Sequence, residues 1–456
     1  MKRCKKNLQP HAGFYLAAIL LFVLSAGSKA AEMDAPGAQV PASQTGGQAG
    51  EKILKLEDAV RIAVENHPRI KGARERVGAQ QAVLGQQLGG YYPTISFNNQ
   101  YRSSTASGTT GVSAEGFDFF SSQATFNMIL YNFGKREGTV QSARDTLDAT
   151  RFNYRTAIDD TVLGVKQAYY TYLAAKALVR VREEAVKNRE LIVRQAQGFY
   201  EVGTRPKIDV ARAESNLYNA RADLIAAQNG VKIAWVTLKN AMGLKDLPEQ
   251  PVALELSMTP IQFSLEQARE SAFASRPELK SFEAQRRAQD QQIATARRGH
   301  LPDIIFDALY GRRHTSSDGT DTFPLRPTWQ VQLSLNFPIF DGFRTTNRVE
   351  EALRNYHSIR AQEEERKQLV ALEVESSYLR LGEAEERIKA TQAAERAAKE
   401  NLDLANGRYQ VGVGSIIEIT DAQTLHTDAQ TNHIRSIYDY KIAEAQLIRA
   451  VGRPEP

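Results

Sequence analysis

The pair of side chains most suggestive of chemistry is His426 and His433, seven positions apart on a predicted helix. Two histidines on one helix face could sense pH, because imidazole titrates near neutrality. Both also fall at the a positions of a heptad pattern, so packing between helices is the favoured interpretation. The sequence lacks the H-E-x-x-H, G-x-S-x-G, P-loop and G-x-G-x-x-G motifs of metalloproteases, hydrolases and nucleotide-binding enzymes. We therefore expect no enzyme, no catalytic residue, no metal site and no cofactor.

The chain contains an internal repeat with a constant offset of 209 positions. Pro68 recurs as Pro277, and Tyr200 recurs as Tyr409. The helices and strands of this repeat position the polar side chains. An offset that holds through helices, strands and turns indicates that each half is one structural unit. Solenoids need more and shorter copies, so a pseudo-symmetric part of a larger ring is favoured. We expect repeat 1 at residues 53–243, an inter-repeat linker at 244–264, repeat 2 at 265–452 and a C-terminal tail at 453–456.

Residues 1–30 are typical of a secretory signal peptide, with basic residues, an apolar run at 14–24 and a small-residue cleavage site that ends at Ala30. The apolar run is shorter than the roughly 20 residues that a membrane-spanning helix needs. The only cysteine, Cys4, lies in this segment. Ser28 stands where a lipid-bearing cysteine would be required, so we expect no acyl anchor. Residues 31–52, rich in small and polar residues, are expected to be a flexible leader.

The net charge of +5 and the isoelectric point near 9.0 raise the question of nucleic-acid binding. The basic residues are interspersed with acidic ones, for example in the stretch 363–367. This mixture is typical of solvated helix faces rather than of a basic patch. We therefore expect no nucleic-acid partner.

Each repeat is expected to begin with a helix that a proline interrupts and to continue with two strands. The helices are predicted at 53–89 and 265–298, with a kink or break at Pro68 and Pro277. The strands are predicted at 94–102, 117–131, 303–312 and 328–340.

The last predicted strand alternates between apolar and polar side chains. Its apolar members are Trp329, Val331, Leu333, Leu335 and Phe337. Such a strand suits a half-buried soluble sheet, or an outer-membrane barrel with lipid outside and water inside. A length of about ten residues and aromatic residues near the strand ends favour the membrane.

Two very long helices follow the strands of repeat 1, at 136–197 and 206–242, and a glycine-bearing turn at 198–203 joins them. The second of these has a heptad pattern with apolar a positions and alanine at every d position. The a residues are Val210, Leu217, Leu224, Val231 and Leu238, and the d residues are Ala213, Ala220, Ala227, Ala234 and Ala241. The d residues of repeat 2 are Ala422, Ala429, Ser436, Ala443 and Ala450. Small d residues let backbones approach closely, so we expect a coiled coil of long, parallel-lying helices.

Four strands cannot close a barrel, for which about eight is the practical minimum. Unpaired strand edges in a bilayer would leave backbone groups without hydrogen bonds. Other copies of the chain must therefore complete the barrel, and rotational symmetry is the usual way. Two copies would leave too narrow a channel, so a trimer with twelve strands is favoured.

The doubled helix–strand–strand–helix–helix unit and its two glycine turns, Y-E-V-G-T-R from Tyr200 and Y-Q-V-G-V from Tyr409, resemble the TolC-like outer membrane efflux protein family. The resemblance covers residues 53–452. It implies a mainly α fold with transmembrane β-strands, in which a trimeric twelve-stranded barrel in outer-membrane lipid continues as a long coiled-coil helical tunnel into the periplasm. It also implies export of small molecules or proteins, delivered by a periplasmic membrane-fusion adaptor and an inner-membrane transporter.

The same resemblance assigns a periplasmic gate. Asp209 and Glu418 match a first acidic position that faces the lumen, and Asp421 matches a second, where repeat 1 has Arg212. Solvated surface charge is the alternative for these acids. Further family positions are matched by Tyr200, Arg205 and Tyr409, whose bonds would hold the tips closed. The adaptor would dock at Val202, Gly203, Thr204, Val411, Gly412 and Val413. Pro206 departs from the family pattern, which leaves the hydrogen bonding there open.

A different class of function, a periplasmic coiled-coil scaffold with a small soluble β-sheet, is the alternative. The two interpretations differ in what covers the apolar side of the strands. A soluble sheet needs a core over that side in both repeats, whereas a membrane strand leaves it to lipid.

Overall fold

The structure is a computed structural model that describes residues 53–106, 115–253, 264–317 and 325–452. The predicted signal peptide 1–30, the leader 31–52 and the tail 453–456 lie outside these residues. Among the helices that the structure describes, none combines the length and apolar composition needed to cross a membrane.

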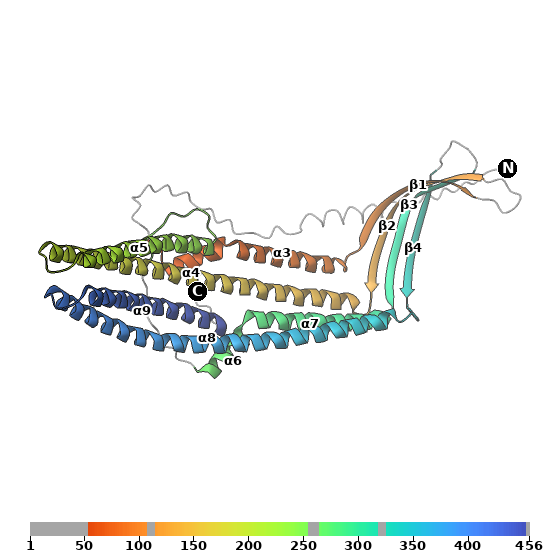
Figure 1. Ribbon diagram of the computed structural model, residues 1–456. Coiled ribbons are helices and arrows are strands. Elements are labelled where there is room, and N and C mark those ends of the chain that lie inside the picture. Colours follow the sequence, from red (N-terminus) through yellow and green to blue (C-terminus); the bar gives the residue numbers. More distant parts are fainter. Residues whose placement is uncertain (1–52, 107–114, 254–263, 318–324, 453–456) are drawn as a thin grey trace, which may run out of the picture. The chain divides into compact units, whose positions relative to one another are not determined.

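The two halves contain the same elements in the same order (Figure 1). The first half contains α2 (Leu56–Asn66), α3 (Pro68–Gly89), β1 (Thr94–Ala106), β2 (Glu115–Tyr131), α4 (Lys135–Glu201) and α5 (Lys207–Ala241). The second contains α6 (Leu265–Ser275), α7 (Pro277–Arg297), the short 3₁₀ helix η2 (Arg298–His300), β3 (Asp303–Ser317), β4 (Arg326–Asn336), α8 (Arg344–Gln410) and α9 (Ile416–Val451). Each helix of the first half begins 209 positions before its counterpart, and α4 and α8 both have 67 residues.

Proline determines several boundaries. Pro68 and Pro277 break the predicted helices into α2 and α3 and into α6 and α7, as expected, because proline lacks the N–H of the helical hydrogen bond. The strand predicted to 340 ends at Asn336, since Pro338 cannot donate to a neighbouring strand. The helix predicted to end at 197 continues to Glu201. Pro206 lies before the first turn of α5 in an extended conformation (φ −78°, ψ 155°), rather than inside it.

The four strands form one antiparallel sheet in the order β1-β2-β3-β4, and β1 and β3 extend beyond their predicted ends at 102 and 312. The register brings apolar residues of all four strands onto one face: Phe97 pairs with Ala124, Ala124 with Tyr310, and Tyr310 with Trp329. The opposite face carries polar contacts, such as that from Asn127 to Asp307. In the described residues the apolar face has no covering core, and its large side chains are exposed. This favours the membrane interpretation over the soluble sheet.

The long helices pack as the heptads predict. Position a and d residues of α5 lie in two core clusters with α4, one near the tip with Ile192 and one further along with Val165. In α9 four of the five predicted d residues are buried, and Ala429 is half-buried. The hairpins α4–α5 and α8–α9 also pack against each other through α4 and α9 (Figure 1).

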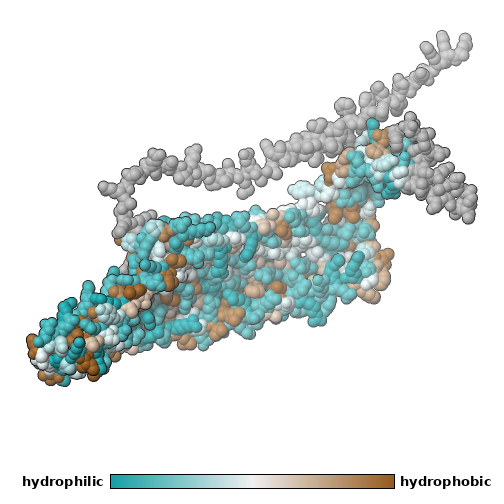
Figure 2. Space-filling model, turned by 45° about the horizontal axis from the view of Figure 1, so that its top comes forward, coloured by the Kyte–Doolittle hydropathy of each residue, from teal (hydrophilic) through white to brown (hydrophobic). Residues whose placement is uncertain are grey.

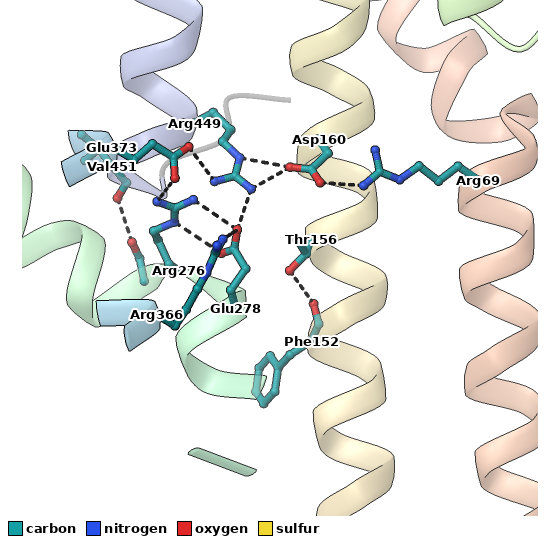
Figure 3. Close-up of polar contacts among 11 residues, drawn as sticks. Arg69, Phe152, Thr156, Asp160, Arg276, Glu278, Arg366, Glu373, Arg449 and Val451 are labelled. Carbon is teal, nitrogen blue, oxygen red and sulfur yellow. Dashed lines mark hydrogen bonds and ion pairs between the residues drawn. The ribbon is translucent and has the colours of Figure 1, made fainter. Parts of the chain in front are cut away.

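A cluster of charged side chains joins the two repeats where α6 meets α7 (Figure 3). Arg276, only 1% exposed, binds Glu278 (Nη2–Oε1 3.1 Å) and Glu373 of α8 (Nη1–Oε2 2.7 Å). Arg449 of α9 contacts Glu373 and crosses to Asp160 of α4 (Nη2–Oδ1 2.6 Å). Arg69 of α3 and Arg366 of α8 complete the cluster. Removing one partner of a buried pair leaves an uncompensated charge, so these residues depend on one another.

Asp159 lies beside this cluster, but it forms none of the ion pairs of the cluster. Burial raises the pKa of Asp159 to about 6, and the negative charges of Glu278 and Asp160 add to the effect. Because the ordinary pKa is 3.8, the folded protein binds this proton more tightly than the unfolded chain does. The stability that protonation provides is therefore complete below pH 3.8 and is lost as the pH rises through about 6.

Replacing Asp159 by Asn should raise the thermal transition temperature at pH 7.5, because the neutral amide avoids the cost of a half-buried charge. The gain corresponds to ~1 kcal/mol, since solvent screens a half-buried group. Thermal unfolding followed by helical circular dichroism at pH 7.5 and pH 3.5 measures it. A gain of equal size at both pH values would contradict the raised pKa.

Candidate functional site: the two helical tips

Each long hairpin ends in a tip, a five-residue turn at 202–206 between α4 and α5 and at 411–415 between α8 and α9. Gly203 (φ +74°) and Gly412 (φ +82°) adopt the left-handed conformation that glycine reaches without steric cost. The Thr204 N–H donates to the Phe199 carbonyl (2.9 Å), and the Val413 N–H to the Arg408 carbonyl (3.0 Å). These bonds satisfy carbonyls at the helix ends. Both glycine-bearing turns are confirmed. The first lies at 202–206, a few residues later than the predicted 198–203.

Arg205 connects the two tips. Its Nη2 donates to the carbonyl oxygen of Gly412 (2.9 Å) and to that of Gly414. Hydrogen bonds from a charged donor contribute about 1.5–3 kcal/mol each when well formed. The second tip fixes these acceptors through its own bonds, because the Gly414 N–H donates to Arg408 and a side chain at 414 would collide with Tyr409. A single side chain of repeat 1 therefore holds the backbone of repeat 2.

Tyr409 is fully buried, and its ring packs edge-on against Phe199 with centroids 5.6 Å apart. The guanidinium of Arg205 lies 5.8 Å from the centre of the same ring. Burial raises the pKa of the Tyr409 hydroxyl, the charge of Asp209 adds to this, and Arg205 acts in the opposite direction. Within the described part of the chain this hydroxyl has no hydrogen-bond partner. Tyr409 thus joins the tips by packing, whereas the resemblance to the family implied a bond.

The predicted acidic residues lie near the starts of α5 and α9. Asp209 is buried in the first turn of α5, where a negative charge suits the helix N-terminus. Glu418 pairs with Arg408 of α8 (2.9 Å), and its backbone N–H donates to the side-chain oxygen of the capping residue Ser415. Asp421 is exposed and acts electrostatically on Arg189 of α4, whose pKa burial lowers.

The remaining predicted residues lie on the outside of the tips. Tyr200 is half-exposed, and the described residues include no bond to its hydroxyl. The side chains of Val202, Val411 and Val413 are among the exposed large apolar ones of the chain. Brown patches at the tip end of the helices show this hydrophobic surface (Figure 2). The structure thus brings Arg205, Tyr409 and Asp209 together, but leaves Tyr200 apart from them.

Both histidines lie in contacts between helices, as the packing interpretation predicted. His426 is buried and lies near Asn188 of α4 and Leu402 of α8. His433 contacts the Thr391 hydroxyl through Nδ1 (3.3 Å) and lies 3.8 Å from Glu395. The described residues contain no group of three histidine, cysteine or carboxylate side chains arranged to hold a metal ion.

Sequence reasoning missed Arg408 and Arg189, the cations that face Glu418 and Asp421. Arg408 stands ten positions before its partner and Arg189 lies on another hairpin, so no helical spacing connects either pair. For Arg408 and Glu418, opposite charges on the two sides of the predicted second turn were the available signal, whereas Arg189 and Asp421 had none.

Comparison with known proteins gives consistent results. The family model of the outer membrane efflux protein matches twice, at residues 59–244 and 268–453. Protein CyaE of Bordetella pertussis is 24% identical over 88% of this chain and 84% of that protein. The outer membrane protein TolC of Vibrio cholerae is 24% identical over 87% of this chain and 90% of that protein. The solved structure of the Campylobacter jejuni CmeC outer membrane channel superposes with a TM-score of 0.76 at 19% identity, covering 88% of this chain and 87% of that one.

Proposed function

Because this chain belongs to the outer membrane efflux protein family, we propose that the contact of Arg205 with the second tip keeps the periplasmic end of an export channel closed. Membership of the family shows that the protein is a channel-tunnel of the outer membrane. It is a transport protein rather than an enzyme. It functions as a trimer with a periplasmic adaptor and an inner-membrane pump.

One observation carries the gate proposal: in the described residues, the bonds from Arg205 are the only hydrogen bonds between the two tips. The contact is accessible at one of its two bonds, since Arg205 is half-buried and Gly412 is exposed, whereas Gly414 is buried. A partner that binds the tips could therefore reach and replace these bonds. Losing them would free one hairpin to move away from the other while the helices stay intact.

We further propose that Glu418 and Asp421 line the gate as rings of carboxylates in the trimer, whereas the buried Asp209 belongs to the gate through its place beside Tyr409. Three-fold symmetry multiplies each acid, and closely spaced carboxylates attract cations. The nearby Arg408 and Arg189 offset part of this charge. Glu418 and Asp421 would bind cations fully only when their arginine partners move away, which couples the charge of the mouth to its opening.

We propose the exposed residues of both tips as the surface on which the adaptor docks: Val202, Gly203, Thr204, Val411, Gly412 and Val413. Valines that lie in water in the isolated chain gain free energy when a partner covers them, by about 25 cal/mol per Å² of apolar area. The glycines bring the backbone close to such a partner.

Replacing Arg205 by Ser should raise the conductance of the resting channel in planar bilayers. Two charge-assisted bonds are lost, and each 1.4 kcal/mol shifts the closed-to-open equilibrium about tenfold. Lys207→Ser removes the same charge from an exposed position two residues on and should conduct like the parent. Tyr409→Phe should also stay closed, because the ring packing remains. Equal conductance of R205S and K207S would contradict the proposal.

The same recordings test the carboxylate rings. Multivalent cations added on the periplasmic side should block R205S more strongly than the parent, and the block should disappear when Glu418 and Asp421 are also replaced by Ala. Block that persists without both carboxylates would show that they face away from the lumen.

Replacing Val411 by Asp should abolish export in cells and leave the trimer in the outer membrane, because a charge would lie in the docking surface. Val411→Thr keeps the shape and should retain export. Gly412→Trp is a weaker test, since any side chain at φ +82° strains the turn itself. Normal export by V411D, measured with the adaptor and pump present, would remove this tip from the docking surface.

A further inference from the structure

The contact between the two hairpins changes from apolar to polar part of the way along α4 and α9. Near the tips an apolar cluster includes Ile192 of α4 and Ile419 of α9. Further along, a second apolar cluster includes Val165 of α4 and Tyr438 of α9. Between the two clusters lies a stretch that we call the polar layer. It consists of Asn188 and Arg189 of α4 with Gln423, Thr424, His426 and Thr427 of α9.

Two hydrogen bonds cross the polar layer. Nη2 of Arg189 donates to the Thr424 hydroxyl (2.8 Å), and the side-chain nitrogen of Gln423 donates to the Asn188 carbonyl (3.5 Å). The second bond fixes the orientation of the Gln423 amide, because a carbonyl accepts only from the nitrogen end of that group. The other end of the amide, Oε1, therefore needs a donor of its own.

This oxygen is buried beside a small cavity. Gln423 is 4% exposed, and its Oε1 has no hydrogen-bond partner among the described residues. Leaving a buried acceptor unpaired costs free energy, so the native interface is expected to supply a donor. The cavity lies between α4, α8 and α9, and its walls include Arg189, Gln423 and His426. It leaves ≈10 Å³ for the centre of a water molecule, which is about the space that one water needs.

The imidazole at the cavity occupies a position that is apolar in the first repeat. His426 stands 209 positions after Leu217, which belongs to the apolar cluster near the tips. Each of the two side chains is 7% exposed. A heptad a position that holds leucine in α5 thus holds histidine in α9 with equal burial. The polar lining is therefore a feature of α9 and not of the repeat.

We propose that one water molecule binds in this cavity and donates a hydrogen bond to Oε1 of Gln423, so that water is part of the contact between the hairpins. An anion is disfavoured because Oε1 is itself an acceptor. A cation is disfavoured because the guanidinium of Arg189 borders the same space. The volume excludes a larger organic ligand. A water molecule both donates and accepts, and it fits this set of groups.

The water site rests on the proposed gate for its role in export and extends that gate along the helices. A hydrated polar layer separates at low cost, because water replaces each hydrogen bond that is lost. An apolar layer instead exposes its surface to water when it separates. Once the tips part, the hairpins therefore separate through the polar layer and remain joined at the apolar cluster around Tyr438.

The side chains of α9 favour bending over the same stretch. Four threonine hydroxyls donate to the carbonyl four residues earlier, over 2.8–2.9 Å. They belong to Thr420, Thr424, Thr427 and Thr431. Such bonds compete with the main-chain bonds of a helix and favour bending. The equivalent positions of α5 hold Ala211, Ser215, Tyr218 and Ala222. Bending of α9 therefore accompanies separation of the polar layer.

A structure of the closed trimer, at a resolution that shows ordered water, tests the site directly. Density for one water molecule is expected about 2.5–3.0 Å from Oε1 of Gln423. The same map of a Gln423→Leu variant should lack this density, because leucine offers no acceptor. A parent cavity without density, or an Oε1 that bonds to a protein donor instead, would overturn the proposal. This result does not depend on the gate, so it is separate from the proposed function.

Conductance tests the effect of the layer on opening, in the Arg205→Ser background that releases the tips. Gln423→Leu should lower the conductance about tenfold, because separation would then expose an apolar side chain. Gln423→Ser is the matched control, since it keeps the position polar and should conduct like Arg205→Ser alone. Equal conductance of the two variants would overturn the role of the layer. If Arg205→Ser itself conducts like the parent, the proposed function fails instead.

Thiol labelling measures how far the hairpins separate. In a Cys4→Ser background the chain has no other cysteine. Gln423→Cys should react with a water-soluble thiol reagent about tenfold faster when Arg205→Ser is also present. Tyr438→Cys lies in the apolar cluster and should react slowly in both backgrounds. The native mass confirms that each variant assembles. Equal rates for Gln423→Cys in both backgrounds would show that the polar layer stays closed and would overturn its role in opening.

Discussion

The structure depends on one constraint: a helix of 67 residues has long apolar sides that need neighbours over its whole length. Within the chain, α4 meets this constraint by packing between the helices of both repeats. The duplication provides α8 with the same sides but only half of the neighbours. The sheet has the same property, because its four strands end in two unpaired edges, β1 and β4. The helices and the strands therefore both require further copies of the chain. In both cases the missing neighbour lies beside the chain, at the next position around a ring.

The contacts that join the repeats differ along the helices. Near the junction of α6 and α7, Arg276, Arg449 and their carboxylate partners form a cluster largely withdrawn from water. At the tips, Arg205 provides the hydrogen bonds between the two turns, and Tyr409 adds ring packing beside an apolar cluster that includes Ile192 and Ile419. A buried cluster resists separation because each member left alone would be an uncompensated charge. Surface bonds are exchanged more easily for bonds to water or to a partner. Under the proposed gate, the tips therefore separate while the middle of the helices stays joined.

The sequence was sufficient to predict the repeat, the helix breaks at Pro68 and Pro277, the heptad core and the four strands. These features follow from local rules, namely the missing N–H of proline, the spacing of seven and the alternation of two. Strand ends were less accurate, because continued pairing between β2 and β3 extends strands beyond their apolar stretch. The resemblance to a family indicated the tip residues, and the structure brings three of them together.

The sequence did not predict contacts between side chains that are distant along the chain. Arg276 appeared only as the residue before a proline, yet it is the most buried arginine of the charged cluster. The partners of Glu418 and Asp421 lie on other helices, so that no fixed spacing marks them. The unpaired hydroxyl of Tyr409 was expected to form a bond, because sequence position alone does not distinguish a hydrogen bond from ring packing. Long-range polar pairing requires the register of two helices, which only the folded chain supplies.

As a member of a trimeric family, this chain forms one third of a closed ring. The native mass of the protein, extracted from outer membranes in mild detergent, tests it most directly. We expect a single species of three chains. A single-chain species that retains the circular dichroism of its strands would contradict it, since the strand edges and the free side of α8 would then need no partner.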